Sequence, residues 1–352
     1  MKQDLLEALE ALEREKGISK ALLIETIEAA LITAYKKNFG SSQNVVITID
    51  ENSGDVKVYS RREIVEESMD DFFEISLVDA KKIDPNYEIG DSIDTEVTPK
   101  DFGRIAAQTA KQVVVQRIRE AERSIIFDEF ADRESEIVTG IIQRISKGTV
   151  FINLGKTEAV LLATEQIPGE EYPQGGRIKS FIVEVSKTSK GPQVVVSRTH
   201  PGLVKRLFEL EVPEIYNGEV EIRGISREAG SRTKIAVFAA NADIDPVGSC
   251  VGPKGARVQN IVTELGGEKI DIIKWNENPA EFISNALSPS KVDLVEVREL
   301  DKSALVVVPD YQLSLAIGKE GQNARLAAKL TGWKIDIKSA TQYEKIKLAA
   351  TE

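Results

Sequence analysis

The chain has 352 residues, of which 41% are apolar and 29% charged, and its formal net charge is −11. This length exceeds one ordinary hydrophobic core, so we expect two to four domains. The single cysteine, Cys250, excludes a disulfide framework and a cysteine-built metal site, and the single histidine, His200, excludes a multi-histidine metal site. No apolar run is long enough to cross a membrane, and the first residues do not resemble a secretory signal. We therefore expect a cytoplasmic protein that binds no metal or other cofactor.

The negative charge is concentrated in the first third of the chain. Residues 1–130 contain 17 basic and 27 acidic side chains, whereas residues 131–352 contain 29 and 30. An acidic segment repels phosphate, so its ligand is expected to be a protein rather than a nucleic acid. The nearly neutral remainder can carry local basic patches.

Residues 1–130 are predicted to begin with two helices followed by a β-hairpin. Leucines at helical spacing indicate a first helix that ends at Gly17, and a second helix stops at Gly40. Alternating apolar residues over 44–50, and again over 56–59, predict the two strands of the hairpin.

A long helix is predicted to close this domain. Thr98-Pro99 offers a capping hydroxyl and a proline for the first turn, and nothing interrupts the helical pattern before about Phe130. A helix of roughly 45 Å suits a rigid connector between domains. An ordinary packed helix of one domain would show the same pattern.

Residues 134–200 are predicted to form a five-stranded β-barrel of the OB type. Short apolar stretches separated by glycines occur at 137–142, 149–154, 159–162, 178–185 and 193–197. The strand that ends in Gly140, the pair Gly175-Gly176 and the closing strand that ends in Ser197-Arg198 resemble the S1 motif, an RNA-binding OB-fold.

RNA recognition by such a barrel combines aromatic rings that stack on bases with basic side chains that contact phosphate. Phe151 and Phe181 are the candidate stacking residues, and either one could instead belong to the core. Lys179 and Arg198 are the candidate phosphate contacts.

The last 150 residues contain an internal repeat. Two Gly-x-x-Gly motifs, at 252–255 and 318–321, recur at a spacing of 66 residues. Each lies between helical stretches and is followed by a strand, and each is preceded by a helix and two strands. The repeat therefore predicts two small α+β domains in tandem, over 201–278 and 279–345, and the first of them has the longer hairpin.

A Gly-x-x-Gly turn between two helices allows close approach of an RNA backbone, and the second helix offers its amide groups to phosphate. The repeat therefore resembles the KH motif, in the type II order. The spacing fits neither a P-loop nor a dinucleotide-binding fingerprint. The predicted RNA contacts are Gly252, Pro253, Lys254, Gly255, Arg257, Gly318, Lys319, Glu320, Gly321, Asn323 and Arg325. Of these, Glu320 departs from a basic loop and is expected to weaken phosphate binding in the second copy.

No catalytic constellation is found. His200 lies in the junction Arg198-Thr199-His200-Pro201, where a surface histidine without a partner is expected rather than a general base. We expect a protein that is not an enzyme.

The order of these parts, an acidic α+β domain, a long helix, an S1 barrel and two KH domains, resembles the NusA family of bacterial transcription termination and antitermination factors. The segments Cys250–Arg257 and Ala316–Asn323 are similar to the two KH signatures of that family.

The resemblance implies that residues 1–130 bind RNA polymerase, and that the barrel and both KH domains hold the nascent single-stranded RNA. Pausing, intrinsic termination and antitermination would be modulated by a monomer, with other Nus-type antitermination factors as further partners. The alternative is an RNA chaperone or an RNA-turnover accessory protein without polymerase contact. In polynucleotide phosphorylase, an RNA-turnover protein, a single KH domain precedes the S1 domain, which is the reverse of the order here.

Overall fold

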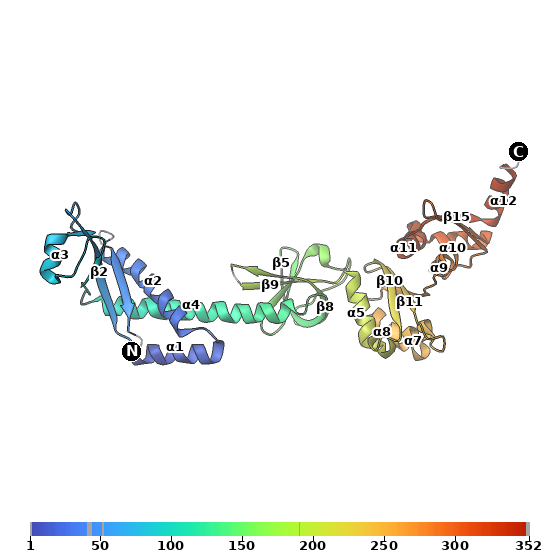
Figure 1. Cartoon of the computed structure of the whole chain (residues 1–352). Coiled ribbons are helices and arrows are strands. Elements are labelled where there is room, and N and C mark those ends of the chain that lie inside the picture. The colour runs from blue at the N-terminus through green and yellow to red at the C-terminus, as the bar shows by residue number, and fades with distance from the viewer. Residues whose placement is uncertain (1, 41–43, 51–52, 190, 350–352) are drawn as a thin grey trace. The chain divides into compact units, whose positions relative to one another are not determined.

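The computed structural model describes residues 2–40, 44–50, 53–189 and 191–349 (Figure 1). The chain divides into two compact units, Met1–Ile125 and Ile126–Glu352. The residue ranges given above for the four domains stay predictions, whereas the multidomain α+β architecture is confirmed by the elements described below.

The first unit is an α+β domain with one mixed sheet. Its elements are α1 (Lys2–Lys16), α2 (Lys20–Phe39), β1 (Val45–Ile49), β2 (Val56–Val65), β3 (Glu74–Ser76), α3 (Leu77–Ile83), β4 (Ser92–Glu96) and most of α4 (Phe102–Ala131). Strand β2 pairs antiparallel with β1 and β4 and parallel with β3. The two helices end before Gly17 and Gly40, as predicted, and both glycines have a positive φ.

This unit has two separate hydrophobic cores. The larger one joins α1, α2 and the first half of α4 to β1 and β2, with Leu23, Leu31 and Phe102 fully buried. The smaller one lies under β3, α3 and β4 and contains Ile64, Ile75, Ala80 and Ile93. Large apolar side chains around this small core, such as Val78 and Ile83, remain exposed to solvent.

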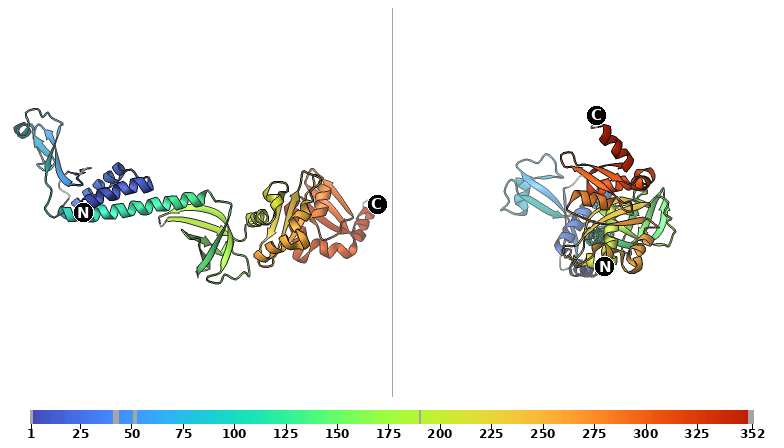
Figure 2. Two further views of the ribbon diagram at one scale, coloured as in Figure 1. Left: turned by 90° about the horizontal axis from the view of Figure 1, so that it is seen from below. Right: turned by 90° about the vertical axis from the view of Figure 1, so that its right-hand side faces the viewer.

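Helix α4 is continuous to Ala131, as Figure 2 shows, but it begins at Phe102 rather than at Thr98. The predicted start is wrong because Thr98 belongs to the edge of the sheet. The backbone N–H of Val58 donates to Thr98 Oγ1 at 3.0 Å, and Val97 N donates to the Val58 carbonyl at 2.8 Å. The capping hydroxyl is therefore already engaged by a strand.

The second unit begins with the closed five-stranded barrel. Its strands are β5 (Ile137–Ser146), β6 (Thr149–Asn153), β7 (Glu158–Leu161), β8 (Arg177–Thr188) and β9 (Gly191–Ser197). They close in the order β5-β6-β7-β9-β8, and only β7 and β9 pair in parallel. Val138, Ile152, Leu161 and Val196 are among the side chains that fill the interior, and Phe130 from the last turn of α4 joins them. The barrel prediction is confirmed.

The two repeats follow with the same element order. The first contains α5 (Pro201–Glu211), α6 (Pro213–Tyr216), β10 (Glu221–Glu228), β11 (Arg232–Phe238), α7 (Pro246–Val251), α8 (Ala256–Glu264) and β12 (Lys269–Lys274). The second contains α9 (Pro279–Ala286), β13 (Leu294–Arg298), β14 (Ser303–Val308), α10 (Leu313–Ile317), α11 (Gln322–Thr331), β15 (Lys334–Ser339) and then α12 (Ala340–Ala349). In each three-stranded sheet the hairpin is antiparallel and the third strand is parallel to the second, which is the type II KH topology.

None of the helices in the described ranges combines the length and the apolar character that crossing a lipid bilayer requires.

Gly140 is the most tightly packed glycine of the barrel strands described here. A Cβ at Gly140 would lie 2.4 Å from Ile152 Cγ2 and 2.8 Å from the Asn153 carbonyl oxygen. We expect Gly140→Ala to lower the free energy of unfolding by about 1–3 kcal/mol, because overpacking displaces the neighbouring strand β6. Scanning calorimetry of the full chain measures this effect as a lower transition temperature.

Gly103→Ala is the matched control, because a Cβ there meets nothing within 4 Å and the residue lies inside helix α4. This change should be neutral or stabilising by up to about 1 kcal/mol. Equal transition temperatures for the two variants would contradict the packing argument.

Candidate nucleic-acid interface

The two Gly-x-x-Gly loops have the same backbone conformation. Each first glycine, Gly252 or Gly318, has φ near +75°, and so does each fourth residue, Gly255 or Gly321. The third residue, Lys254 or Glu320, also has a positive φ, of 52° and 53° respectively. A left-handed conformation is uncommon for side chains of this kind and is typical of turns that serve binding.

The two glycines of each loop serve different purposes. A Cβ at Gly252 would lie 2.6 Å from Arg257 Cγ, and a Cβ at Gly318 would lie 2.8 Å from the Asn323 backbone nitrogen. The first glycine is therefore required for packing inside the protein. At Gly255 and Gly321 a Cβ would meet nothing within 4 Å, so the second glycine faces open space. The sequence predicted that an RNA backbone could approach both glycines of each loop closely, but only the second glycine has open space around it.

Arg257 and Asn323 occupy equivalent positions in the two repeats, and each stabilises its loop by hydrogen bonds to the preceding helix. Arg257 Nη1 donates to the Ser249 carbonyl at 2.6 Å and pairs with the carboxylate of Glu214 at 2.9 Å. The side-chain amide of Asn323 donates to the Ala316 carbonyl at 3.0 Å, and the residue is buried. Both side chains tie the second helix to the end of the first, so they shape the loop instead of pointing toward a ligand.

The positive groups at the two loops are the lysines and the starts of α8 and α11. Lys254 and Lys319 are exposed, and no ion pair of either is found in the described part of the chain. The residues that precede α8 and α11 are Gly255 and Gly321, and neither helix has a side chain that caps its first N–H groups. The Ala256 and Gln322 amides already donate to the Pro253 and Lys319 carbonyls, so it is the positive dipole end of each helix that favours an anion such as phosphate.

Arg325 is exposed but is bound to a carboxylate of the first repeat. Its Nε donates to Glu228 Oε1 at 2.7 Å, and its Nη1 donates to the Glu320 carbonyl at 3.1 Å. The hydrogen bond from Arg325 lowers the pKa of Glu228, to which Gln322 also donates, so this carboxylate stays ionised. Contact with phosphate would compete with this existing pair.

Phe151 lies on β6 and is half-buried in the barrel wall, beside an arginine that the sequence analysis missed. The guanidinium carbon of Arg144 lies 3.9 Å from the centre of the Phe151 ring, and Arg144 also pairs with Glu158. Arg144 is the residue opposite Phe151 in the pairing of β5 and β6. The alternation of side chains along the predicted hairpin is the signal that could have indicated it.

The sequence left open whether Phe181 stacks on a base or belongs to the core, and the structure shows that it is a core residue. It is buried, and its ring stacks on that of His200 with a centroid distance of 4.5 Å. His200 itself precedes α5, where its Nδ1 accepts a hydrogen bond from Gly202 N at 3.0 Å.

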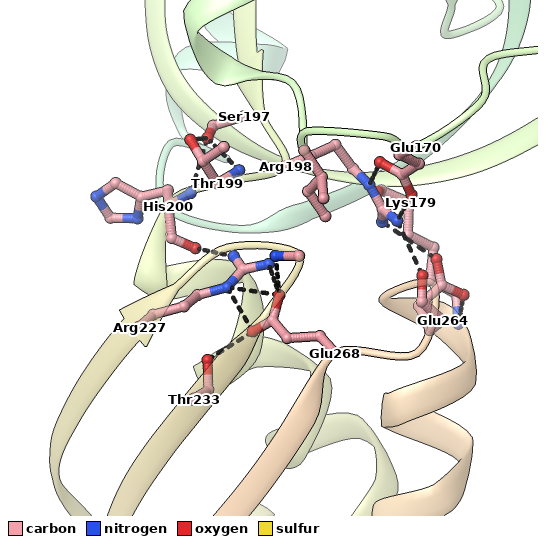
Figure 3. A network of polar contacts seen from close by, with 12 residues as sticks. Glu170, Lys179, Ser197, Arg198, Thr199, His200, Arg227, Thr233, Glu264 and Glu268 are labelled. Carbon is pink, nitrogen blue, oxygen red and sulfur yellow. Dashed lines mark hydrogen bonds and ion pairs between the residues drawn. The ribbon is translucent and has the colours of Figure 1, made fainter. Parts of the chain in front are cut away.

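The prediction of Arg198 as a phosphate contact is corrected by the structure, which places this side chain inside the junction between the barrel and the first repeat (Figure 3). Only 2% of Arg198 is exposed. The guanidinium pairs with Glu170, and it donates to the carbonyls of Lys179 and Glu264 at 2.8 Å each. Burial acts to lower the pKa of Arg198, but the bond and charge of Glu170 offset this and the pKa is raised.

Lys179 lies beside the same junction, where its Nζ is 3.5 Å from Glu264 Oε2. It borders a groove of about 420 Å³ that is also lined by the carboxylates of Glu211 and Glu264. These negative groups reduce the attraction of Lys179 for phosphate.

A second buried ion pair completes the junction, as Figure 3 also shows. Arg227 from β10 donates to both carboxylate oxygens of Glu268, and both side chains are almost fully buried. Arg227 Nη1 also donates to the His200 carbonyl at 3.0 Å, and the Thr233 hydroxyl donates to Glu268 Oε1. With each remaining lone pair satisfied, the pair keeps its geometry in a desolvated site.

Two features bear on reactive and metal-binding chemistry, the single cysteine and the grouping of possible metal ligands. Cys250 is fully buried next to the first loop, and burial raises the pKa of its thiol to about 12, so it stays protonated. Within the residues that the structure describes, no group of three or more histidine, cysteine, aspartate or glutamate side chains could hold a metal ion.

Comparison with known families and proteins agrees with this arrangement. Residues 4–124 match the family described as NusA N-terminal domain, residues 198–275 the NusA-like first KH domain, and residues 279–345 the NusA-like second KH domain. The solution structure of the N-terminal domain of NusA from Bacillus subtilis is 57% identical and covers 35% of this chain and 99% of its own, with a TM-score of 0.33.

Full-length relatives extend the similarity to the whole chain. A transcription termination/antitermination protein NusA from Halalkalibacterium halodurans is 60% identical over 352 residues, which is all of this chain and 92% of the relative. The protein of the same name from Bacillus subtilis is 60% identical over 346 residues, or 98% of this chain and 93% of the relative. The chain therefore belongs to the NusA family of transcription termination/antitermination proteins.

Proposed function

We propose that this protein binds RNA polymerase through residues 1–130 and holds the nascent single-stranded RNA with its barrel and its two KH loops. In this way it modulates transcriptional pausing, intrinsic termination and antitermination. The names of its full-length relatives and the two KH family matches support this function. We further propose that it acts in the cytoplasm as a monomer without catalytic activity, and that other Nus-type antitermination factors join it.

The observation that carries the RNA-binding part is the open second glycine of each loop. Gly255 and Gly321 have free space where a side chain would stand, at the start of helices that no side chain caps. A ribose-phosphate backbone can therefore come close to the positive dipole ends of α8 and α11. Lys254 and Lys319 add positive charge beside this approach.

The proposed contacts are accordingly divided by role. Direct contact with RNA is assigned to Gly255, Pro253, Lys254, Gly321, Lys319 and Glu320, and on the barrel to Phe151 with Arg144. Support of the loop is assigned to Gly252, Arg257, Gly318 and Asn323. Lys179 and Arg325 are weaker candidates for contact with RNA, because each already pairs with a carboxylate.

The polymerase-binding part is supported by one surface of the N-terminal unit, residues 66–91, which we call the acidic lobe. It contains nine acidic and two basic residues. Large apolar side chains nevertheless stand exposed on it: Met69, Phe72, Phe73, Val78, Ile83 and Ile89. Exposed apolar groups among carboxylates fit a protein partner that is basic and partly apolar, and they do not fit RNA.

Substitution of the open glycines tests the RNA-binding loops. Gly255→Asp and Gly321→Asp place a carboxylate where phosphate must approach, so each should weaken binding of single-stranded RNA by at least about tenfold. Fluorescence anisotropy with the full chain measures this. Gly266→Asp and Gly332→Asp are matched controls, because these glycines also have a positive φ and open space but lie at the other end of α8 and α11. Equal affinity for all four variants would refute the loop contacts.

The dependence of affinity on salt tests the role of the lysines. Each phosphate contact on a single strand contributes a slope of about −0.7 in a plot of log affinity against log salt concentration. The double variant Lys254→Ala, Lys319→Ala should therefore make the slope shallower by about 1.4. Lys205→Ala removes an exposed lysine from α5 and should leave the slope unchanged. An unchanged slope in the double variant would show that these lysines do not contact phosphate.

A pausing assay with purified RNA polymerase tests the transcriptional role. The full chain should alter the dwell time at pause sites, and the double variant Met69→Ser, Phe72→Ser should need at least about tenfold more protein for the same effect, because apolar anchors dominate interface energies. Its affinity for free RNA should stay unchanged.

Leu300→Ser is the control, since this side chain is fully exposed but lies in the second KH domain. If the full chain binds RNA and leaves pausing unaffected, the alternative of an RNA chaperone without polymerase contact is favoured.

A further inference from the structure

The hairpin of the first KH domain, β10 and β11, is longer than its counterpart in the second. Strand β10 has eight residues, whereas β13 has five. At the end of the shorter hairpin Leu300 is fully exposed. The longer hairpin instead has its end in contact with the second KH domain on one side and with the barrel on another.

Contact with the second KH domain is made at the RNA-binding loop itself. Gln322, the first residue of α11, directly follows Gly321. Its side-chain amide donates to Glu228 Oε2 at 2.8 Å and to the Ser231 hydroxyl at 2.7 Å. The hairpin of one domain therefore holds the residue that follows the loop of the other.

Arg325 provides a second connection between the same two parts. It donates to Glu228 Oε1 at 2.7 Å and, through Nη1, to the backbone carbonyl of Glu320 within the loop. A continuous series of hydrogen bonds thus runs from Glu228 through Arg325 to the loop backbone. The two partners of Glu228 lie three residues apart on α11, so they determine the rotation of this helix about its axis.

The hairpin is in turn fixed from the side of the barrel. Arg227 donates to the carbonyl of His200 and forms the buried pair with Glu268. Near the turn, Gly230 approaches the barrel so closely that a Cβ there would lie 2.6 Å from Ile167 Cγ2. Glu228 is therefore presented by a hairpin whose own position is well determined.

The first loop has no equivalent of this arrangement. Alignment of the two Gly-x-x-Gly motifs places Ala256 opposite Gln322 and Gln259 opposite Arg325. A methyl group cannot form the bonds of Gln322, and an amide cannot form the ion pair of Arg325. The two loops thus differ in their support although their backbones are alike.

We propose that Glu228 is a positioning residue for RNA binding by the second KH domain, because it orients the Gly318–Gly321 loop through Gln322 and Arg325. This inference rests on the proposed function, since it assigns a support to a loop that is itself proposed to bind RNA. It also explains why Arg325 is not free for phosphate.

The experiment isolates each loop in the full chain. Glu228→Ala is measured in the Gly255→Asp background, where binding depends on the second loop, and in the Gly321→Asp background, where it depends on the first. We expect affinity for single-stranded RNA to fall roughly threefold to tenfold in the first background and to stay unchanged in the second. General destabilisation of the protein would lower the affinity in both.

Two further variants complete the experiment. Glu228→Gln removes the charge and replaces one of the two accepting oxygens by a donating NH2 group, so it accepts from only one of Gln322 and Arg325, and its affinity should lie between those of the unchanged chain and Glu228→Ala. Glu221→Ala removes an exposed carboxylate from the same strand, where it pairs only with Arg223 in the described chain, and it should have no effect. Hydrogen exchange of residues 318–324 should be faster in Glu228→Ala and unchanged in Glu221→Ala.

Three results would overturn the proposal. An equal loss in both backgrounds would assign Glu228 a merely structural role. A gain of affinity would mean that Glu228 restrains Arg325 as a phosphate ligand. If Gly255→Asp and Gly321→Asp themselves leave RNA affinity unchanged, the proposed function fails, and the positioning role fails with it.

Discussion

The proposed RNA site depends on a backbone turn in which the two glycines have different requirements: the first is closely packed and the second is open. The first glycine of each loop is pressed against residue 257 or 323, which binds carbonyls at the end of the preceding helix. This contact determines the angle between the two helices. The second glycine is then left facing open space at the start of a helix that no side chain caps. The open position of each loop is thus a consequence of the packing around the first glycine.

Three arginines at junctions between domains and two lysines at the loops have different surroundings. Arg198, Arg227 and Arg325 each bind a carboxylate and at least one backbone carbonyl at a junction between domains. A planar guanidinium with five donors can satisfy several acceptors in a fixed geometry, which suits such junctions. Lys254 and Lys319 remain exposed at the loops. A flexible ammonium group contacts phosphate as a point charge, without a fixed orientation.

The acidic N-terminal unit and the loops of the KH domains differ in surface chemistry, and the proposed division of ligands rests on this difference. The small core under β3 and α3 leaves large apolar side chains exposed among carboxylates, which disfavours nucleic acid and favours a protein surface. The separation of charge along the chain is therefore consistent with the proposal that the first unit binds a protein and the KH domains bind RNA.

The sequence by itself determined the first two helices and the hairpin that follows them, the barrel, the repeat and both loops, because periodicity and glycine spacing report local backbone structure directly. It also indicated Lys254 and Lys319, since the motif fixes their place next to the turn. It did not indicate β3, α3 and β4, which are short and lie between residues 59 and 98. Tertiary structure alone showed the surroundings of Arg198, Phe181 and Glu228, and it placed the start of α4 at Phe102 rather than at Thr98. In each case the deciding partner is distant in sequence, as Glu264 is from Arg198 and Val58 is from Thr98. A charged or polar side chain has the same local pattern whether it faces solvent or a neighbouring domain, so only the folded chain distinguishes the two.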